Sequence, residues 1–228
     1  MSDAGLHVLY ADNHVLAVAK PAGLPSVPDD SGDMSMLDLA REWVRVEKNK
    51  PGNVFLGVVH RLDRPVSGVL LFARTSKAAS RLSDAFRDRR VEKTYWGVTS
   101  RAPQTETGNL EQWLRKDRER NRVHVVAPES PESRRALTRW RTLSLSDQGP
   151  GRVLLELSPL TGRSHQLRVA AASVASPLLG DLKYGASEPL PDKSIALHAR
   201  SLLVPHPTSG ETLHLECPVP PLWVWRFS

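Results

Sequence analysis

The sequence contains little cysteine and no long apolar run. One cysteine, Cys217, stands among 228 residues, so an internal disulfide and a zinc site with several cysteine ligands are both excluded. Cys217 lies in an apolar, strand-like stretch beside Pro218, and we do not expect it to act as a thiol nucleophile. No apolar run approaches the roughly 20 residues that span a bilayer, and residues 1–6 lack the regions of a secretory signal. We therefore expect a cytoplasmic protein without membrane contact.

Positive charge is in excess. The formal net charge is +6 and the isoelectric point is about 9.8, which makes a polyanionic partner plausible. The basic residues gather in three segments: Arg81, Arg87, Arg89, Arg90 and Lys93; Arg115, Lys116, Arg118, Arg120 and Arg122; Arg134, Arg135, Arg139 and Arg141. Acidic residues are interspersed, so each segment by itself also fits a solvated, salt-bridged face. The predominance of arginine, which binds phosphate through a bidentate fork, favours contact with phosphate.

Short apolar runs dominate the chain, and Gly, Pro, Asn or Asp separate many of them. The runs cover residues 6–10, 15–19, 55–59, 69–73, 94–99, 123–127, 137–145, 153–157, 196–204 and 212–216. This spacing is typical of strands in a sheet-rich domain. The strand runs outnumber the helical patterns and do not alternate with them. The sequence therefore predicts an α+β fold with a mixed, largely antiparallel sheet and flanking helices, and argues against a doubly wound parallel sheet.

Three segments carry the pattern of a helix. Apolar residues between Leu37 and Val44 form one face after Asp33 and Ser35, and those between Ala78 and Phe86 form another after a capping candidate at Ser76. A third helix is expected over about 164–174. Residues 21–35 and 100–107 read as loops, and 128–135 as a mobile basic turn. We expect one domain over 1–228, with at most two lobes.

The densest polar segment is His60-Arg61-Leu62-Asp63-Arg64-Pro65-Val66-Ser67-Gly68. It places one carboxylate, Asp63, between Arg61 and Arg64. Because an apolar run precedes the segment and another follows it, Asp63 is predicted to lie on a strand-to-strand connection held by rigid structure on both sides. A carboxylate in such a position is either structural or catalytic.

A second polar segment reads Leu160-Thr161-Gly162-Arg163-Ser164-His165-Gln166-Leu167-Arg168. Gly162 permits a tight turn into the following helix, whose first turn is expected to present Arg163 and free backbone N–H groups to an anion. That anion is either Asp63 or a phosphate. On spacing alone we favour the structural alternatives, which are an ion pair at the surface or between elements for Arg163 and a hydrogen-bonded core histidine for His165.

Taken together, these segments resemble a known family. His60-Arg61-Leu62-Asp63 with Ser67-Gly68, Lys93-Thr94-Tyr95, the segment from Gly162 to Arg168, and Pro177-Leu178-Leu179-Gly180-Asp181 closely resemble the RluA family of pseudouridine synthases, in the family's order. Lys20-Pro21-Ala22-Gly23-Leu24 and Leu197-His198-Ala199 resemble it as well, so the likeness extends from residue 20 to about 206. Two positions depart from the usual pattern, namely Val66 in place of threonine and Ala170 in place of histidine.

The resemblance implies isomerisation of specific uridines in structured ribosomal or transfer RNA, without cofactor or metal. It makes Asp63 the nucleophile, acting on either the base or the sugar. It further implies that Tyr95 stacks on the target uracil and helps remove the final proton, that Arg163 pairs with the nucleophilic carboxylate, and that Arg61 fills the gap left by the extruded base. The residues expected to contact RNA are His60, Arg61, Lys93, His165, Gln166 and Arg168. We expect one pseudouridine synthase catalytic domain over 1–228, without the accessory N-terminal RNA-binding domain of some relatives. We expect the enzyme to be a monomer that binds an RNA stem-loop.

Two other functions remain open at this point. An RNA-binding protein of the same fold without turnover is favoured by the basic segments alone, whereas the intact Asp63, Tyr95 and Arg163 argue against it. A carboxylate-dependent hydrolase would need a second acid that these segments do not offer.

Overall fold

The computed structural model describes residues 5–49, 52–146 and 151–227. The chain forms two compact units. The first unit comprises residues 1–92 and 199–218, and the second comprises residues 93–198 and 219–228. The chain passes between the units within strands β5 (Glu92–Thr99) and β10 (Leu197–Pro205), and again after Pro218. The expectation of one catalytic domain over the whole chain stays a prediction.

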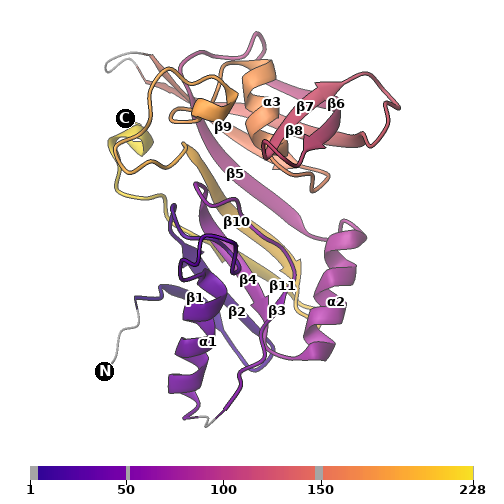
Figure 1. Ribbon diagram of the computed structural model, residues 1–228, viewed down its shortest axis with the longest axis vertical. Coiled ribbons are helices and arrows are strands. Elements are labelled where there is room, and N and C mark those ends of the chain that lie inside the picture. The colour runs from indigo at the N-terminus through magenta and orange to yellow at the C-terminus, as the bar shows by residue number, and fades with distance from the viewer. Residues whose placement is uncertain (1–4, 50–51, 147–150, 228) are drawn as a thin grey trace. The chain divides into compact units, whose positions relative to one another are not determined.

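The first unit is built on a sheet with strands in the order β1 (Val8–Ala11), β2 (Val15–Lys20), β4 (Ser67–Ala73) and β10 (Figure 1). β11 (Thr212–Glu216) pairs with β10, and the short β3 (Gly57–Val58) pairs with β4. The β1–β2, β2–β4, β3–β4 and β10–β11 pairs are antiparallel. These strands match apolar runs in the sequence, although only Gly57 and Val58 of the run 55–59 are in a strand.

Both faces of this sheet are covered, which explains why β2 and β4 are almost wholly apolar. Leu16, Val18, Leu70 and Phe72 pack with α1 (Met36–Glu47) on one face. Val15, Ala17, Val69 and Leu71 alternate with them and pack with α2 (Ser76–Arg87) on the other. Because alternate strand residues face opposite sides, one run of apolar residues fills two cores.

Capping residues set where these helices begin. The side chains and backbone N–H groups of Ser35 and Asp38 form a reciprocal capping box at α1. At α2 the cap is Thr75, whose hydroxyl accepts a hydrogen bond from Ala78 N at 3.1 Å. The sequence-based choice of Ser76 was wrong by one position, because Thr75 has the extended backbone that a cap requires and Ser76 is already helical.

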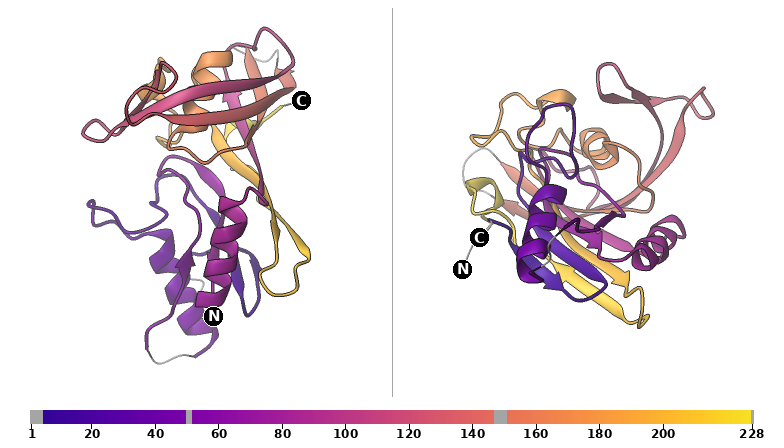
Figure 2. Two further views of the ribbon diagram at one scale, coloured as in Figure 1. Left: turned by 90° about the vertical axis from the view of Figure 1, so that its right-hand side faces the viewer. Right: turned by 60° about the horizontal axis from the view of Figure 1, so that its bottom comes forward.

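The second unit contains a sheet in the order β5, β9 (Arg152–Pro159), β8 (Arg134–Ser146), β6 (Thr107–Asp117) and β7 (Arg122–Val126), and each neighbouring pair is antiparallel. α3 (Gln166–Val174) packs on it through Val169, which contacts Leu114, Val123 and Ala136. Two short 3₁₀ helices, η1 (Leu182–Tyr184) and η2 (Trp223–Trp225), complete the unit. The β6–β7 hairpin projects as a two-stranded arm (Figure 2).

The predicted α+β fold with a largely antiparallel sheet is confirmed. One strand, β6, did not stand out in the sequence, because most of its residues are polar and few of its side chains are buried. The basic stretch 128–135 is a turn that passes into β8 at Arg134. Within the described part of the chain, no helix combines the length and apolarity that crossing a membrane demands.

Candidate active site

Asp63 lies in the connection between β3 and β4, as the sequence predicted. A tight turn begins at Asp63, whose carbonyl accepts a hydrogen bond from Val66 N at 3.0 Å. The preceding Leu62 is buried and bonds through both backbone groups to the Ser26 hydroxyl, at 2.7 and 3.0 Å. Since Val66 is also buried, the backbone on either side of Asp63 is fixed.

Lys20, the last residue of β2, supports this loop from inside the first unit. It is 1% exposed, and its ammonium donates to the carbonyls of Pro21, Arg64 and Val66 at 2.9, 3.1 and 2.7 Å. Burial lowers the pKa of Lys20 to about 7, although the negative charge of Asp63 acts to raise it. Lys20 thus holds the turn around Asp63 and places a titratable positive charge near its carboxylate.

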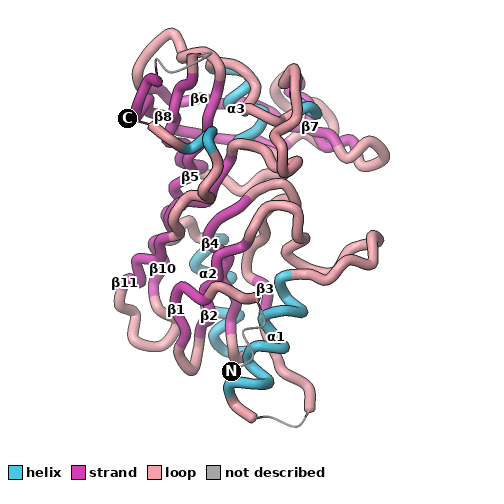
Figure 3. The backbone as a smooth tube through the Cα atoms, turned by 90° about the vertical axis from the view of Figure 1, so that its left-hand side faces the viewer, coloured by secondary structure: helices cyan, strands magenta, loops and turns pink. Residues whose placement is uncertain are grey.

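Arg64 anchors the turn from its outer side. Its guanidinium makes a bidentate contact with Asp29 at 2.9 and 3.0 Å and also bonds to Asp33 and Ser31, both at 2.6 Å. Hydrogen bonds from Ser31 and Arg64 lower the pKa of Asp29 to about 2. These residues belong to the loop before α1, which stands out from the rest of its unit (Figure 3). Because the pairs are exposed, they order the loop more than they stabilise the fold.

His60 and Arg61 precede Asp63 in the same loop. His60 Nε2 accepts the N–H of Leu71 at 3.0 Å, and its ring stacks on Phe86 with the centroids 5.0 Å apart. Arg61 is exposed. RNA contacts by these two residues stay predictions, but His60 has an additional role in joining the loop to β4 and α2.

Lys93 and Tyr95 lie in the second unit, on β5. They are two positions apart in a strand and so share one face of it. Tyr95 is opposite Leu157 of β9 in the antiparallel register, which fixes the position of its backbone. Burial lowers the pKa of Lys93.

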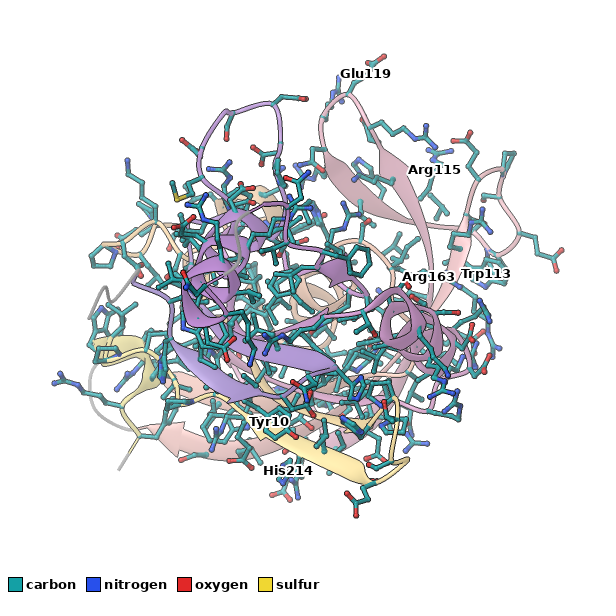
Figure 4. All side chains as sticks on the ribbon, turned by 90° about the horizontal axis from the view of Figure 1, so that it is seen from below. Tyr10, Trp113, Arg115, Glu119, Arg163 and His214 are labelled. Atoms are coloured by element: carbon teal, nitrogen blue, oxygen red, sulfur yellow. The ribbon has the colours of Figure 1, made fainter. Side chains whose placement is uncertain are left out.

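Arg163 lies in the loop between β9 and α3, and its side chain is exposed (Figure 4). Its Nε donates to the carbonyl of Arg135 at 3.0 Å. One expectation for this loop was wrong: α3 begins at Gln166, so Arg163 precedes the first helical turn. The residue with left-handed backbone at this helix start is His165, with φ of 51°.

Gln166 organises the same loop. Its side-chain carbonyl accepts from the Thr161 hydroxyl at 2.7 Å and from Arg163 N at 3.1 Å. Its amide nitrogen donates to Leu137 O at 2.8 Å and to the Thr138 hydroxyl at 3.0 Å. The side chain is 3% exposed, so these four hydrogen bonds give Gln166 a structural role, and its RNA contact stays a prediction.

His165 and Arg168 are buried beside this loop. Arg168 forms a bidentate ion pair with Asp181 at 2.7 and 2.6 Å, and both side chains are nearly inaccessible. His165 Nδ1 lies 2.7 Å from the Tyr184 hydroxyl. The sequence reasoning assigned no role to Lys20, Asp181 or Tyr184. For Lys20 a signal existed, since a lone charge ends the otherwise apolar run 15–19.

The predicted site residues therefore form two groups. Asp63 belongs to the first unit together with His60 and Arg61. The second unit contains Lys93, Tyr95, Arg163, His165, Gln166 and Arg168. Among the described residues, no group of three or more His, Cys, Asp or Glu side chains could hold a metal ion. Cys217 is buried, and burial raises the pKa of its thiol to about 11, which disfavours the nucleophilic thiolate.

Comparison with known proteins places this arrangement in a family. Residues 14–173 match the family described as RNA pseudouridylate synthase. The chain is 35% identical over 218 residues to the dual-specificity RNA pseudouridine synthase RluA of Yersinia pestis, which covers 92% of this chain and 97% of that protein. It is 33% identical over 215 residues to the ribosomal large subunit pseudouridine synthase C of Rickettsia conorii, with coverage of 94% and 68%.

A solved structure agrees with the sequence comparisons. The human RNA pseudouridylate synthase domain containing 4 superposes with a TM-score of 0.77 at 26% identity, covering 94% of this chain and 89% of that one. The antiparallel sheets and the Asp63 turn are thus found in a chain whose fold and sequence both match these enzymes. This chain belongs to the RNA pseudouridine synthase family of isomerases.

Proposed function

We propose that this enzyme converts specific uridines of structured ribosomal or transfer RNA to pseudouridine, with Asp63 as its nucleophile. The observation that carries this proposal is the Asp63 turn in a chain of this family, with its backbone held by Lys20 and Ser26. In the reaction the bond between N1 of uracil and C1′ of ribose breaks, and a bond between C5 and C1′ forms. The hydrogen on C5 leaves as a proton and N1 gains one, so no oxidant, reductant or second substrate is consumed.

Asp63 is suited to this role because its position is fixed before RNA binds. A carboxylate nucleophile must stay ionised, and a nearby positive charge favours the ionised form. Lys20 supplies such a charge within the first unit at pH values up to about 7, where its ammonium is still protonated. Val66 fits the same arrangement, because it supports the turn through a buried apolar side chain and a backbone carbonyl, neither of which requires threonine.

Tyr95 and Arg163 complete the proposed machinery. The target uridine has to leave its stack at a cost of a few kcal/mol, and stacking on the Tyr95 ring returns part of that free energy. In the complex with RNA, the guanidinium of Arg163 stabilises the charge of the reacting carboxylate, and Arg61 occupies the space that the base has left. The exposed arginines bind the phosphate backbone.

The names of two relatives guide the choice of substrate. The Yersinia pestis protein is called dual-specificity, and the Rickettsia conorii protein is named for the large ribosomal subunit. We therefore propose stem-loops of ribosomal RNA, transfer RNA or both as the substrate of this enzyme. RNA binding without turnover is the alternative that the same experiment tests.

Tritium release provides this test. Unmodified large-subunit ribosomal RNA and transfer RNA transcripts that carry tritium at C5 of uridine are incubated with the protein, and RNA binding is measured in parallel. We expect tritium release into water, with the label lost from a few positions that sequencing then identifies as pseudouridine. Tight RNA binding without tritium release from either ribosomal RNA or transfer RNA would contradict the proposal and favour an inactive RNA-binding protein.

A further inference from the structure

One hydroxyl group in the second unit joins three separate elements. Tyr184, in η1, accepts a hydrogen bond from the backbone N–H of Val123 on β7 at 2.9 Å. The same hydroxyl lies 2.7 Å from Nδ1 of His165, the residue that immediately precedes α3. A chain of hydrogen bonds therefore leads from the β6–β7 hairpin through η1 to the loop that contains Arg163.

The partners of the Tyr184 hydroxyl bear on where its proton lies. A tyrosine hydroxyl has one proton, and here its oxygen already accepts the N–H of Val123. Within the described residues, His165 Nδ1 is the only group positioned to accept that proton. Burial raises the pKa of Tyr184, which keeps the hydroxyl protonated. A hydroxyl proton directed to His165 would leave Nδ1 unprotonated and place the imidazole proton on Nε2.

The ring of Tyr184 is held independently of its hydroxyl. The Arg168 guanidinium lies 5.0 Å from the ring centroid and that of Arg122 lies 5.6 Å away, both in cation–π contact. Asp181 in turn fixes Arg168 through their bidentate ion pair. Removal of the hydroxyl alone therefore leaves the ring packed in place.

The hairpin that the hydroxyl contacts carries the second basic segment. Arg115 lies on β6 and Glu119 at the tip of the hairpin (Figure 4). A second bond, from Lys183 Nζ to Asn121 O at 2.8 Å, also joins η1 to this hairpin. η1 thus contacts the basic hairpin close to its turn, and Tyr184 also contacts the residue that follows the Arg163 loop.

We propose that Tyr184 is a positioning residue, which couples the basic hairpin to the Arg163 loop and fixes His165 as the tautomer protonated on Nε2. This proposal deepens the function proposed above and rests on it for its kinetic consequence. Tyr184 contacts both the basic hairpin and the residue that precedes α3. Binding of phosphate by the hairpin is thereby linked to the geometry of the loop that acts on the uridine.

The test compares Tyr184→Phe with Tyr10→Phe, which removes a tyrosine hydroxyl bonded to Asp12 in the first unit. For Tyr184→Phe we expect kcat to fall about tenfold, while KM and the melting temperature stay close to wild type. Tyr10→Phe is expected to leave kcat unchanged. An equal decrease of kcat in both variants, or unchanged kcat in Tyr184→Phe, would overturn the coupling.

Two further measurements separate positioning from a merely structural role. Nitrogen-15 NMR of the histidine rings reports the tautomer directly. The signals of His165 are identified by their absence in the His165→Asn variant, which is chosen because asparagine tolerates the left-handed backbone at this position. We expect a single Nε2–H form in wild type and a tautomer mixture in Tyr184→Phe. In the His165→Asn background, Tyr184→Phe is expected to lower kcat by less than about twofold.

The two proposals fail differently. A proton on Nδ1 of His165 in wild type would overturn the relay, whether or not the protein is active. A further tenfold decrease in the His165→Asn background would show that Tyr184 acts without His165 and would also overturn it. Absence of turnover in wild type, with the Nε2–H tautomer present, would contradict the proposed function and the kinetic coupling but not the hydrogen-bond relay.

Discussion

Lys20 gives the molecule a pH-dependent stability that can be measured. The pKa of Lys20 is about 7 in the folded protein, whereas that of a fully exposed lysine is 10.5. Between pH 7 and 10.5 the unfolded chain binds one proton more than the folded chain. The free energy of unfolding therefore increases as the pH rises through this range. The slope is about 1.4 kcal/mol per pH unit. Integrated from pH 7.5 to 9.5, this contribution amounts to about 2.5 kcal/mol.

The perturbation is Lys20→Met, which keeps the length of the side chain but removes the titratable group. The free energy of unfolding is measured by urea denaturation across this pH range. Wild-type stability should increase relative to Lys20→Met by about 2.5 kcal/mol between pH 7.5 and 9.5, because the titrations of all other groups cancel in the difference. Lys77→Met, at an exposed position on α2, is the matched control and should parallel wild type. A constant difference between wild type and Lys20→Met would refute the lowered pKa.

Three further predictions concern catalysis, packing and RNA binding. Arg163→Met should lower kcat for tritium release by at least about tenfold while RNA affinity changes little, because the exposed side chain contributes charge rather than packing; normal turnover would remove Arg163 from the mechanism. Gly68→Ala should destabilise the protein by roughly 1–3 kcal/mol or more in urea unfolding, because φ is +124° and a Cβ would lie 2.3 Å from Ala199 O; an unchanged midpoint would contradict this. Neutralising the exposed Arg87, Arg89 and Arg90 together should reduce the salt dependence of RNA binding, with the slope falling by about 0.7–0.9 for each phosphate that these arginines neutralise; an unchanged slope in filter binding would show that the phosphates are bound elsewhere.

The fold was predictable where burial dictates residue type. β2 and β4 are apolar on both faces because α1 and α2 cover them, so they stood out in the sequence. β6 did not, because its hairpin is largely exposed and its residues are mostly polar. The cap at Thr75 was misassigned by one residue, since Ser is the more favourable N-cap in sequence and only the backbone angles identify Thr75.

The site was predictable for residues that carry chemistry and not for those that support them. Asp63 was placed correctly on its connection because the flanking apolar runs define it. The start of α3 was not placed correctly, because the left-handed residue before it is His165 and the loop is held by hydrogen bonds that Gln166 accepts from Thr161 and Arg163. Lys20 and Tyr184 act through contacts with residues 19 to 61 positions away, and such contacts leave no local pattern.

The most direct test of the central claim is Asp63→Asn, which preserves the size of the side chain and removes its charge. Tritium release, RNA affinity and thermal unfolding are measured on one preparation, with Asp30→Asn in the neighbouring exposed loop as the control. If Asp63 is the nucleophile, turnover falls to background while RNA affinity and the melting temperature match the control, because the contacts to phosphate lie mainly elsewhere. If Asp63 instead has a structural role in a buried ion pair, its replacement by Asn should lower the free energy of unfolding by roughly 3–5 kcal/mol. A stable Asp63→Asn protein that still forms pseudouridine at a near-normal rate would contradict the account.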